Sequence, residues 1–501
     1  MSMCYYLGID QGTTGTAVLL LDEQFRLKGR GYREHRQYYP KPGWVEHDPL
    51  EIWQSVLFAA KQALDAAGAR PEEIRCIGLD NQGETCLIWD RATGQPVALA
   101  IVWQDRRTAE DADLLSRTSG EWIRARTGLV ADAYFSATKL RWLLDNIPGL
   151  RERARQGEVL AGTLDSWLLW KLTGGAVHAT DPSTASRTML FHLETGAWDQ
   201  ELLDMLDIPR AILPEIRDSA GSFGVTDPDS FLGASVPITA ALTDQQAALF
   251  GQSCFFPGDV KTTYGTGCFM LMNTGKKAVC SRSGLLTTVA WGLNKELTFA
   301  LDGGIYIAGA VVQWLRDGLK LIRSAQETIA LSLSAPDNGG MYFVPAFAGL
   351  AAPHWDQYAR GTIVGLTAGV TREQFVRAAL ESVAYQVYDN LEAMQSVSGI
   401  HIPSIRADGG MVANPFLMQF QADILGIPVE VSEIADTTAW GTARCAALGL
   451  GDFSSLSELT GQSLQKKCYI PNMSSDQRQH LMHQWHRAVQ RSLAWEEHGS
   501  H

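Results

Sequence analysis

Residues 5–21 read YYLGIDQGTTGTAVLLL, two β-rich runs separated by a turn of Asp, Gly and Thr residues. Residues 5–9 and 17–21 predict the two strands of a hairpin, with residues 10–16 at its tip. A loop of glycine and small hydroxyl residues offers backbone N–H groups that can approach phosphate oxygens. It is not a Walker A loop, because GxxxxGK[ST] is absent and no lysine follows. By itself, such a loop is more often only a turn.

The same pattern of a strand, a polar residue and a glycine-rich or polar turn recurs along the chain. Residues 405–407 predict a strand that leads into Asp408-Gly409-Gly410, before Asn414 and a helical run at residues 416–425. Residues 238–242 lead into Thr243-Asp244-Gln245-Gln246, which opens an alanine-rich helix, and Tyr264-Gly265-Thr266-Gly267 precedes a strand at residues 268–272. Several phosphate-type loops in one chain are harder to explain as turns, and they predict a shared nucleotide site.

Length and periodicity predict two α/β domains. At 501 residues the chain is too long for one hydrophobic core. Helical spacing at residues 49–66, 371–394 and 475–495 separates the strand clusters and indicates mixed sheets flanked by helices. We place the boundary at residues 243/244, giving an N-terminal domain, 1–243, and a C-terminal domain, 244–501. No low-complexity linker separates them, so we expect a packed hinge and a ligand in the cleft between the domains.

Composition argues against several classes of partner. A net charge of −13 leaves no broad basic surface for nucleic acid. No run approaches the roughly 20 apolar residues that span a bilayer, so we expect no membrane insertion. The start of the chain lacks a basic segment and a cleavage site, which favours the cytoplasm. Eight cysteines without a CxxC pair are typical of reduced, packed thiols.

Seven segments of the chain carry a family resemblance. YFSATKLRWL at residues 134–143 resembles the first signature of the FGGY carbohydrate kinases, and residues 361–381 resemble the second. Five more segments resemble the glycerol kinase branch of that family: YPKPGWVEHDP (39–49), ASRTMLF (185–191), DQQAALFGQ (244–252), TYGTGCFMLMNTG (263–275) and NPFLMQFQADILG (414–426). The resemblance runs from about residue 8 to residue 497 and is as good as full length.

The resemblance implies a fold and an activity. The fold is that of the actin, Hsp70 and sugar kinase superfamily, in which two actin-like (RNase H-like) domains close over ATP. The activity is ATP-dependent phosphorylation of glycerol to sn-glycerol 3-phosphate, with Asp244 as the general base and Asp10 holding Mg²⁺. We also expect a homo-oligomer, either a dimer or a tetramer.

The resemblance also implies two sets of binding residues. One set contacts the nucleotide and its phosphates: Thr13, Thr14, Gly265, Thr266, Gly309, Gln313, Gly410 and Asn414. The other set forms the polyol pocket, with polar groups for hydroxyls and aromatic faces against the carbon chain: Glu84, Trp103, Tyr134, Asp244, Gln245 and Phe269.

Simpler interpretations exist for these side chains. Without the resemblance, Trp103, Tyr134 and Phe269 would be core aromatics, because large aromatic residues are usually mostly buried. Glu84 would be a solvated surface acid, and Asp244 would be a helix N-cap.

Three other features are interpreted structurally. The histidines at positions 480, 483 and 486 recur every three residues, a spacing that drifts around a helix, and no carboxylate or cysteine in the sequence pattern completes a metal site. We therefore interpret them as a solvated helix face. Trp291 and Trp440 are isolated and are interpreted as packing residues.

The chain departs from the glycerol kinase pattern at two positions. Gly83 replaces an arginine that grips substrate hydroxyls, and Ala17 replaces a basic residue that reaches toward the transferred phosphate. The first change leaves open a kinase for another small polyol or ketose. The second leaves open a catalytically weakened, nucleotide-dependent binding protein, although the retained Asp10 and Asp244 argue against it. A glycine at position 83 could instead serve a backbone with positive φ.

Overall fold

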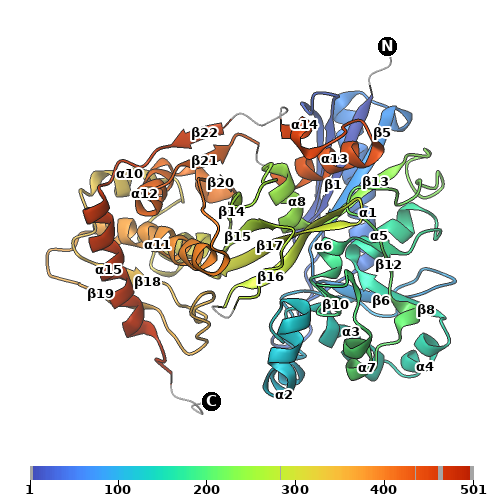
Figure 1. The fold of residues 1–501 in the computed structure, drawn as a ribbon. Coiled ribbons are helices and arrows are strands. Elements are labelled where there is room, and N and C mark those ends of the chain that lie inside the picture. Colours follow the sequence, from blue (N-terminus) through green and yellow to red (C-terminus); the bar gives the residue numbers. More distant parts are fainter. Residues whose placement is uncertain (1–3, 282–283, 435, 461–465, 497–501) are drawn as a thin grey trace.

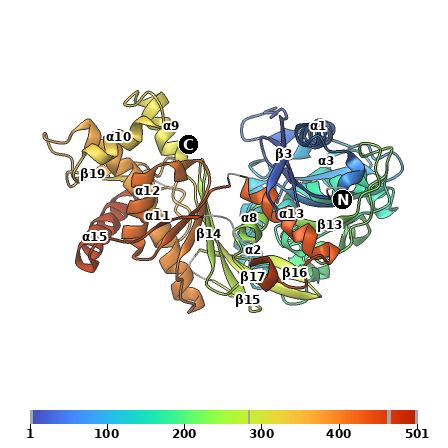
Figure 2. The same ribbon diagram turned by 90° about the horizontal axis from the view of Figure 1, so that it is seen from above.

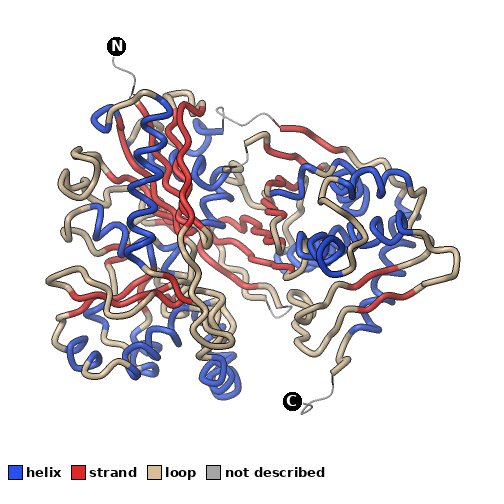
Figure 3. The backbone as a smooth tube through the Cα atoms, turned by 180° about the vertical axis from the view of Figure 1, so that it is seen from behind, coloured by secondary structure: helices blue, strands red, loops and turns tan. Residues whose placement is uncertain are grey.

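The structure is a computed structural model that describes residues 4–281, 284–434, 436–460 and 466–496. It has two lobes, one coloured mainly blue to green and the other mainly yellow to red in Figure 1, and the orange-red residues 437–460 lie on the first of them. Seen from above, the lobes lie side by side, with a short helix, α8 (Asp244–Gly251), between them (Figure 2). Each lobe contains a mixed β-sheet with helices packed against it (Figure 3). Two α/β lobes of this kind agree with the fold expected from the sequence.

The first lobe is built on a five-stranded sheet with the strand order β13-β5-β1-β2-β3. Its members are β1 (Tyr5–Gln11), β2 (Gly15–Leu21), β3 (Leu27–Glu34), β5 (Ile74–Asn81) and β13 (Ile238–Thr243). The first three strands are antiparallel, whereas β5 runs parallel to both β1 and β13. This register places Asp10 beside Asp80 on one side and Ala17 on the other. A smaller sheet contains β4 (Glu46–His47), β7 (Ala100–Ile101), β6 (Cys86–Asp90) and β8 (Val159–Thr163).

The second lobe is built on a seven-stranded sheet with the order β16-β17-β15-β14-β20-β21-β22. The strands are β14 (Val260–Tyr264), β15 (Cys268–Gly275), β16 (Leu286–Leu293), β17 (Glu296–Ile305), β20 (Ile405–Asp408), β21 (Val429–Ser432) and β22 (Lys466–Tyr469). Three two-stranded ribbons complete the sheet structure: β9 (Ala179–Thr180) with β12 (Glu215–Ile216), β10 (Phe191–His192) with β11 (Ala197–Trp198), and β18 (Tyr342–Val344) with β19 (Thr362–Val364).

Helices flank both sheets. Those of the first half are α1 (Pro49–Ala67), α2 (Ala109–Thr127), α3 (Ser136–Asn146), α4 (Leu150–Arg155), α5 (Leu164–Leu172), α6 (Pro182–Ala185) and α7 (Gln200–Leu206). After α8 come α9 (Gly309–Gln313), α10 (Glu327–Ser334), α11 (Arg372–Ser398), α12 (Pro415–Leu425), α13 (Thr437–Leu450), α14 (Leu456–Thr460) and α15 (Ser475–Ser492). In the described residues no helix has the length and apolar character needed to cross a membrane.

Local chemistry explains several of these boundaries. Asn414 caps α12 by accepting hydrogen bonds from the backbone N–H groups of Phe416 and Leu417. Thr371 and Gln374 form a capping box at the start of α11. The last helix ends at Ser492, three residues before the predicted end. Helix termini fray, so an end assigned from the amphipathic repeat can differ from the observed end by a few residues.

Helix α13 belongs to the second half of the sequence but packs on the sheet of the first lobe, against β1, β5 and β13 (Figures 1 and 2). Glycines allow this close approach. A Cβ atom on Gly8 would lie 2.0 Å from the carbonyl oxygen of Ala439, and one on Gly78 would lie 2.3 Å from that of Thr442. The backbone of α13 therefore rests directly on the strands. Trp440 of this helix and Trp291 are buried, which confirms their interpretation as packing residues.

Candidate active site

The glycine and threonine turn joins β1 to β2. Within it, the N–H of Gly12 donates to the carbonyl of Gly15 over 3.0 Å. The indole Nε1–H of Trp103 donates to the hydroxyl of Thr13 over 2.9 Å, whereas Thr14 is exposed. The turn is thus linked directly to an aromatic residue of the predicted polyol pocket.

Asp10 lies at the end of β1 among other carboxyl groups. Burial and the charge of Asp244 raise the pKa of Asp10 to about 7. Asp80, its neighbour on β5, is fully buried and accepts a hydrogen bond from the Thr442 hydroxyl over 2.7 Å. Burial and the charge of Asp10 raise the pKa of Asp80 well above its usual range. Crowded carboxylates at a phosphate site fit a divalent cation, because the cation relieves their mutual repulsion.

Asp244 is the first residue of α8, directly after β13. The N-cap position is occupied by Thr243, so the N-cap interpretation of Asp244 is off by one residue. Its carboxylate accepts a hydrogen bond from the backbone N–H of Gln245 over 2.6 Å. Burial raises the pKa of Asp244, and the positive charge of Lys261 opposes that rise. A carboxylate with a raised pKa and a partly exposed side chain suits a general base.

Lys261 was not anticipated by the sequence analysis. This residue of β14 is fully buried, and its ammonium donates to the hydroxyl of Thr263 over 3.0 Å and to the side-chain oxygen of Gln245. Burial lowers the pKa of Lys261, while the charges of Asp408 and Asp244 oppose that change. A positive charge therefore lies beside the predicted base, contributed by the second lobe.

The aromatic residues of the predicted polyol pocket are not core residues. Trp103, Tyr134 and Phe269 are each only partly buried. The Trp103 and Tyr134 rings meet edge to face with centroids 5.6 Å apart. Lys139 donates to the carbonyl of Tyr134 over 2.6 Å and fixes the segment that carries this ring. The interpretation of these three side chains as ordinary core aromatics is wrong.

Glu84 is not a solvated acid either, since only 4% of its surface is exposed. Burial raises the pKa of Glu84, and the charge of Arg187 opposes that rise. Arg187 donates through Nε to Glu84 over 2.7 Å and through Nη1 to Asp302 over 2.9 Å. Its guanidinium carbon lies 5.8 Å from the centroid of the Tyr134 ring. The sequence analysis missed both Arg187 and Asp302, although Arg187 stands out as the one charged residue within ASRTMLF.

The two departures from the family pattern have structural settings. Gly83 is buried and does not have positive φ, so the backbone explanation for this glycine is wrong. A Cβ atom there would lie 2.7 Å from the Thr243 hydroxyl and 3.7 Å from Cγ of Arg187. Ala17 pairs with Asp10 and Tyr32 across the sheet. Two pairs further along the same strands, where Leu19 pairs with Arg30, the Arg30 guanidinium forms an ion pair with Asp436 over 2.7 Å, and its charge acts on Asp10.

A cavity of about 390 Å³ lies in the second lobe. Six of the residues predicted to bind nucleotide line it together: Gly265, Thr266, Gly309, Gln313, Gly410 and Asn414. A hydrogen bond holds Gly309 at this cavity: its backbone N–H donates to the carbonyl of Gly265, in the turn between β14 and β15, over 2.9 Å. Thr13, Thr14 and Asp10 lie in the first lobe and do not line this cavity. The nucleotide-binding roles of all nine residues stay predictions.

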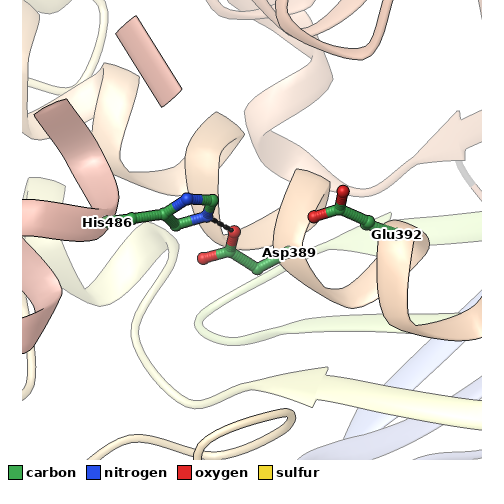
Figure 4. Close-up of side chains that lie close together, drawn as sticks. All are labelled: Asp389, Glu392 and His486. Atoms are coloured by element: carbon green, nitrogen blue, oxygen red, sulfur yellow. Dashed lines mark hydrogen bonds and ion pairs between the residues drawn. The ribbon is translucent and has the colours of Figure 1, made fainter. Parts of the chain in front are cut away.

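The histidine series on α15 differs from its interpretation at one position. His480, His483 and His486 are all exposed. However, the Nε2–H of His486 donates to Asp389 of α11 over 2.8 Å, and Glu392 lies close by (Figure 4). The expectation that no carboxylate joins these histidines is therefore wrong for His486. Trp485 also donates to Asp389, over 2.7 Å, so this buried carboxylate anchors α15 to α11.

The two-lobed fold, the glycine-rich turns on both lobes and the carboxylate cluster at the ends of β1 and β5 are the features expected of an ATP-dependent kinase. Comparison with known families agrees. Residues 5–251 match the N-terminal domain and residues 260–450 match the C-terminal domain of the FGGY family of carbohydrate kinases. The chain belongs to this family.

Individual relatives cover the whole chain. Glycerol kinase 2 of Thermotoga maritima is 54% identical over 99% of this chain and 100% of its own length. Glycerol kinase of Symbiobacterium thermophilum is 53% identical over 99% of both chains. Among solved structures, Plasmodium falciparum glycerol kinase with ADP superimposes with a TM-score of 0.92, at 36% identity over 98% of each chain.

Proposed function

We propose that this kinase transfers the γ-phosphoryl group of ATP to a terminal hydroxyl of glycerol, giving sn-glycerol 3-phosphate and ADP. One observation carries the proposal: the Trp103 and Tyr134 rings meet edge to face, Arg187 joins Glu84 to this pair, and the charge of Asp244 acts on both Glu84 and Tyr134. The full-length similarity to proteins named glycerol kinase supports glycerol as the acceptor.

In this mechanism Asp244 takes the proton of the attacking hydroxyl. The hydroxyl oxygen forms a bond to the γ-phosphorus while the bond from phosphorus to the bridging oxygen breaks, and ADP leaves with that electron pair. The chain's contribution is mainly positioning and neutralisation of charge. Asp10, with Asp244 nearby, would hold Mg²⁺, which neutralises phosphate charge when it is bound. Lys261 and Arg187 place two positive charges near the developing negative charge.

The proposal is tested by measuring ADP release with glycerol, dihydroxyacetone, erythritol and xylulose, with the product identified by phosphorus NMR. We expect the highest kcat/KM with glycerol. Asp244→Asn should fold and bind nucleotide but lower kcat by about 10²-fold or more, the usual contribution of a positioned general base. A preference of ten-fold or more for another acceptor would overturn the choice of glycerol. More than half of the activity remaining in Asp244→Asn would overturn the role of this carboxylate.

Three expectations about the protein's setting remain proposals. We propose that the kinase uses MgATP, works in the cytoplasm and associates as a dimer or tetramer. Light scattering of the purified protein measures the last of these directly, and a monomeric mass at micromolar concentration would contradict it.

A further inference from the structure

Arg187 is a buried cation beside the predicted polyol pocket. Only 5% of its surface is exposed, although it carries a permanent charge. Burying a guanidinium is unfavourable unless its charge and its donors are matched. Two carboxylates match it here, Glu84 from the loop after β5 and Asp302 from β17. The second of these belongs to the other lobe, so the ion pairs Glu84–Arg187–Asp302 bridge the two lobes.

The guanidinium still has unused hydrogen-bonding capacity. Its Nε and Nη1 groups have partners, but no residue in the described part of the chain accepts a hydrogen bond from Nη2. This nitrogen is also not among the side-chain atoms that are closed off from solvent. In the described residues, the second oxygen of Glu84 and the hydroxyl of Tyr134 likewise have no hydrogen-bond partner and are not among the atoms closed off from solvent. Three neighbouring polar groups thus have free positions that a ligand could fill.

The surroundings of Arg187 explain why the free donor can reach a ligand. Gly83 lies beside the stem of Arg187 and contributes no side chain. Phe269 and Asp302 lie on the same face of the second lobe's sheet, because Phe269 pairs with Gly304 and Leu271 pairs with Asp302. The aromatic wall of the pocket and the carboxylate that holds Nη1 are therefore neighbours.

We infer that Arg187 is the cationic hydrogen-bond donor of the acceptor site, where its Nη2 group binds a hydroxyl of the substrate, and that Asp302 positions it from the opposite lobe. The inference rests on the proposed function, since glycerol is the acceptor considered. Arg187 selects acceptors with a hydroxyl next to the one that is phosphorylated. Glu84 accepts the hydrogen of that hydroxyl, which makes a donor and acceptor pair for a diol.

The first test compares Arg187→Lys with the wild type. Lysine keeps the charge but loses the planar fork, so it cannot hold Glu84, Asp302 and a ligand together. We expect the KM for glycerol to rise by about 10- to 100-fold, the usual effect of losing a charged hydrogen bond, while the KM for ATP changes by less than about two-fold. Arg126→Lys is the matched control, because Arg126 forms a comparable pair with Asp199 away from the pocket. An unchanged KM for glycerol in a folded Arg187→Lys protein would overturn the inference.

The second test uses acceptors that lack one hydroxyl. In the wild type, 1,3-propanediol should be a poorer acceptor than glycerol by at least ten-fold, because Nη2 loses its partner. In Arg187→Lys this difference should shrink to about three-fold or less, since the donor is already lost. A purely structural role would lower activity on both acceptors equally and would overturn the inference.

The third test addresses folding and the role of Asp302. If Arg187→Lys fails to fold because Glu84 loses its partner, the paired variant Arg187→Met/Glu84→Gln removes both charges and is compared by calorimetric binding of glycerol. Asp302→Asn should raise the KM for glycerol several-fold with kcat within about two-fold, and no change in KM would refute its positioning role. If the wild-type enzyme does not phosphorylate glycerol, the proposed function is wrong, whatever the role of Arg187. The same comparison on the acceptor that the panel identifies then decides the role of Arg187.

Discussion

The Thr243 hydroxyl limits what can occupy position 83. It lies 2.7 Å from the place where a Cβ atom on Gly83 would be, and it donates a hydrogen bond to the carbonyl of Asn81 over 3.3 Å. Gly83→Ala should therefore lower the free energy of unfolding by about 1–3 kcal/mol, the usual range for overpacking. In a Thr243→Ala background the same change should cost less than about 1 kcal/mol.

Urea unfolding of the two single variants and the double variant measures this coupling. An equal effect of Gly83→Ala in both backgrounds would show that the contact with Thr243 does not explain the glycine. The consequence for function is direct: an arginine cannot be added at position 83 without moving Thr243, so the cation of the pocket must come from elsewhere.

His47 makes the stability of the first lobe depend on pH. It is fully buried beneath the phosphate turn, with Nε2 donating to Gln37 over 2.6 Å and the His35 ring 4.6 Å away. Burial, together with the charge of His35, lowers the pKa of His47 to about 3 from 6.5. Between these values the unfolded chain binds a proton that the folded protein does not, so stability falls as the pH drops below about 6.5.

At pH 5 the loss from this one imidazole is about 2 kcal/mol. Free energies of unfolding measured from pH 5 to pH 7.5 should fall more steeply toward acid for the wild type than for His47→Gln. His483→Gln, at an exposed position of α15, serves as the control variant. Parallel curves for wild type and His47→Gln would contradict the argument.

At the scale of elements, the contact between α13 and the first-lobe sheet depends on glycine. Because a Cβ atom on Gly8 would meet backbone rather than a flexible side chain, Gly8→Ala must displace the whole helix. We expect it to lower the free energy of unfolding by roughly 3 kcal/mol or more.

Gly120→Ala is the matched control for this change. Gly120 lies inside α2, and the nearest atom to its added Cβ is 3.6 Å away. It should therefore stabilise the protein by up to about 1 kcal/mol through helix propensity. Thermal melting of both variants separates the outcomes, and similar melting temperatures for the two would count against the close packing of α13.

Helix α13 also shows which parts of the fold could be predicted from the sequence and which could not. The hairpin of β1 and β2, the strands that end in glycine-rich turns and the long amphipathic helices are set by local patterns, and they were predicted within a few residues. The attachment of α13 to β1 was not predicted, because Gly8 and Ala439 are more than 400 residues apart and no local sequence pattern marks either residue.

The candidate site also contains residues that the sequence predicted and residues that it did not. The aromatic and acidic residues of the pocket were found through family motifs. Asp302 and Lys261 were missed because their contacts join segments far apart in the sequence. Arg187 is the one charged residue of ASRTMLF, but its partners Glu84 and Asp302 lie outside that motif. The simpler interpretation of Glu84 failed for the same reason, since its partner is 103 residues away.

At the scale of the whole molecule, closure of the lobes should require both substrates. The proposed acceptor pocket draws on Glu84 and Arg187 from one lobe and on Phe269 and Asp302 from the other, while the cavity lined by the residues predicted to bind nucleotide lies in the second lobe. Closing the lobes excludes water, which otherwise competes with the polyol for the phosphoryl group.

Small-angle X-ray scattering measures this closure. The radius of gyration should decrease when glycerol and a non-hydrolysable ATP analogue are both present, and by less with either one alone. Equal values in all four conditions would refute ligand-dependent closure.

The position of α13 has a consequence for synthesis on the ribosome. The strands β1, β5 and β13 are complete once residue 243 has been made, but the helix that covers their glycine-lined face ends only at Leu450. At about 5–20 residues per second, the nascent first lobe must wait on the order of 10–40 s with this face uncovered. Throughout that interval Asp80 lacks the Thr442 hydroxyl, and the exposed sheet is a surface for chaperones to shield. A ribosome that stalls between residues 243 and 450 therefore leaves a first lobe that has its sheet but lacks helix α13, which covers that sheet.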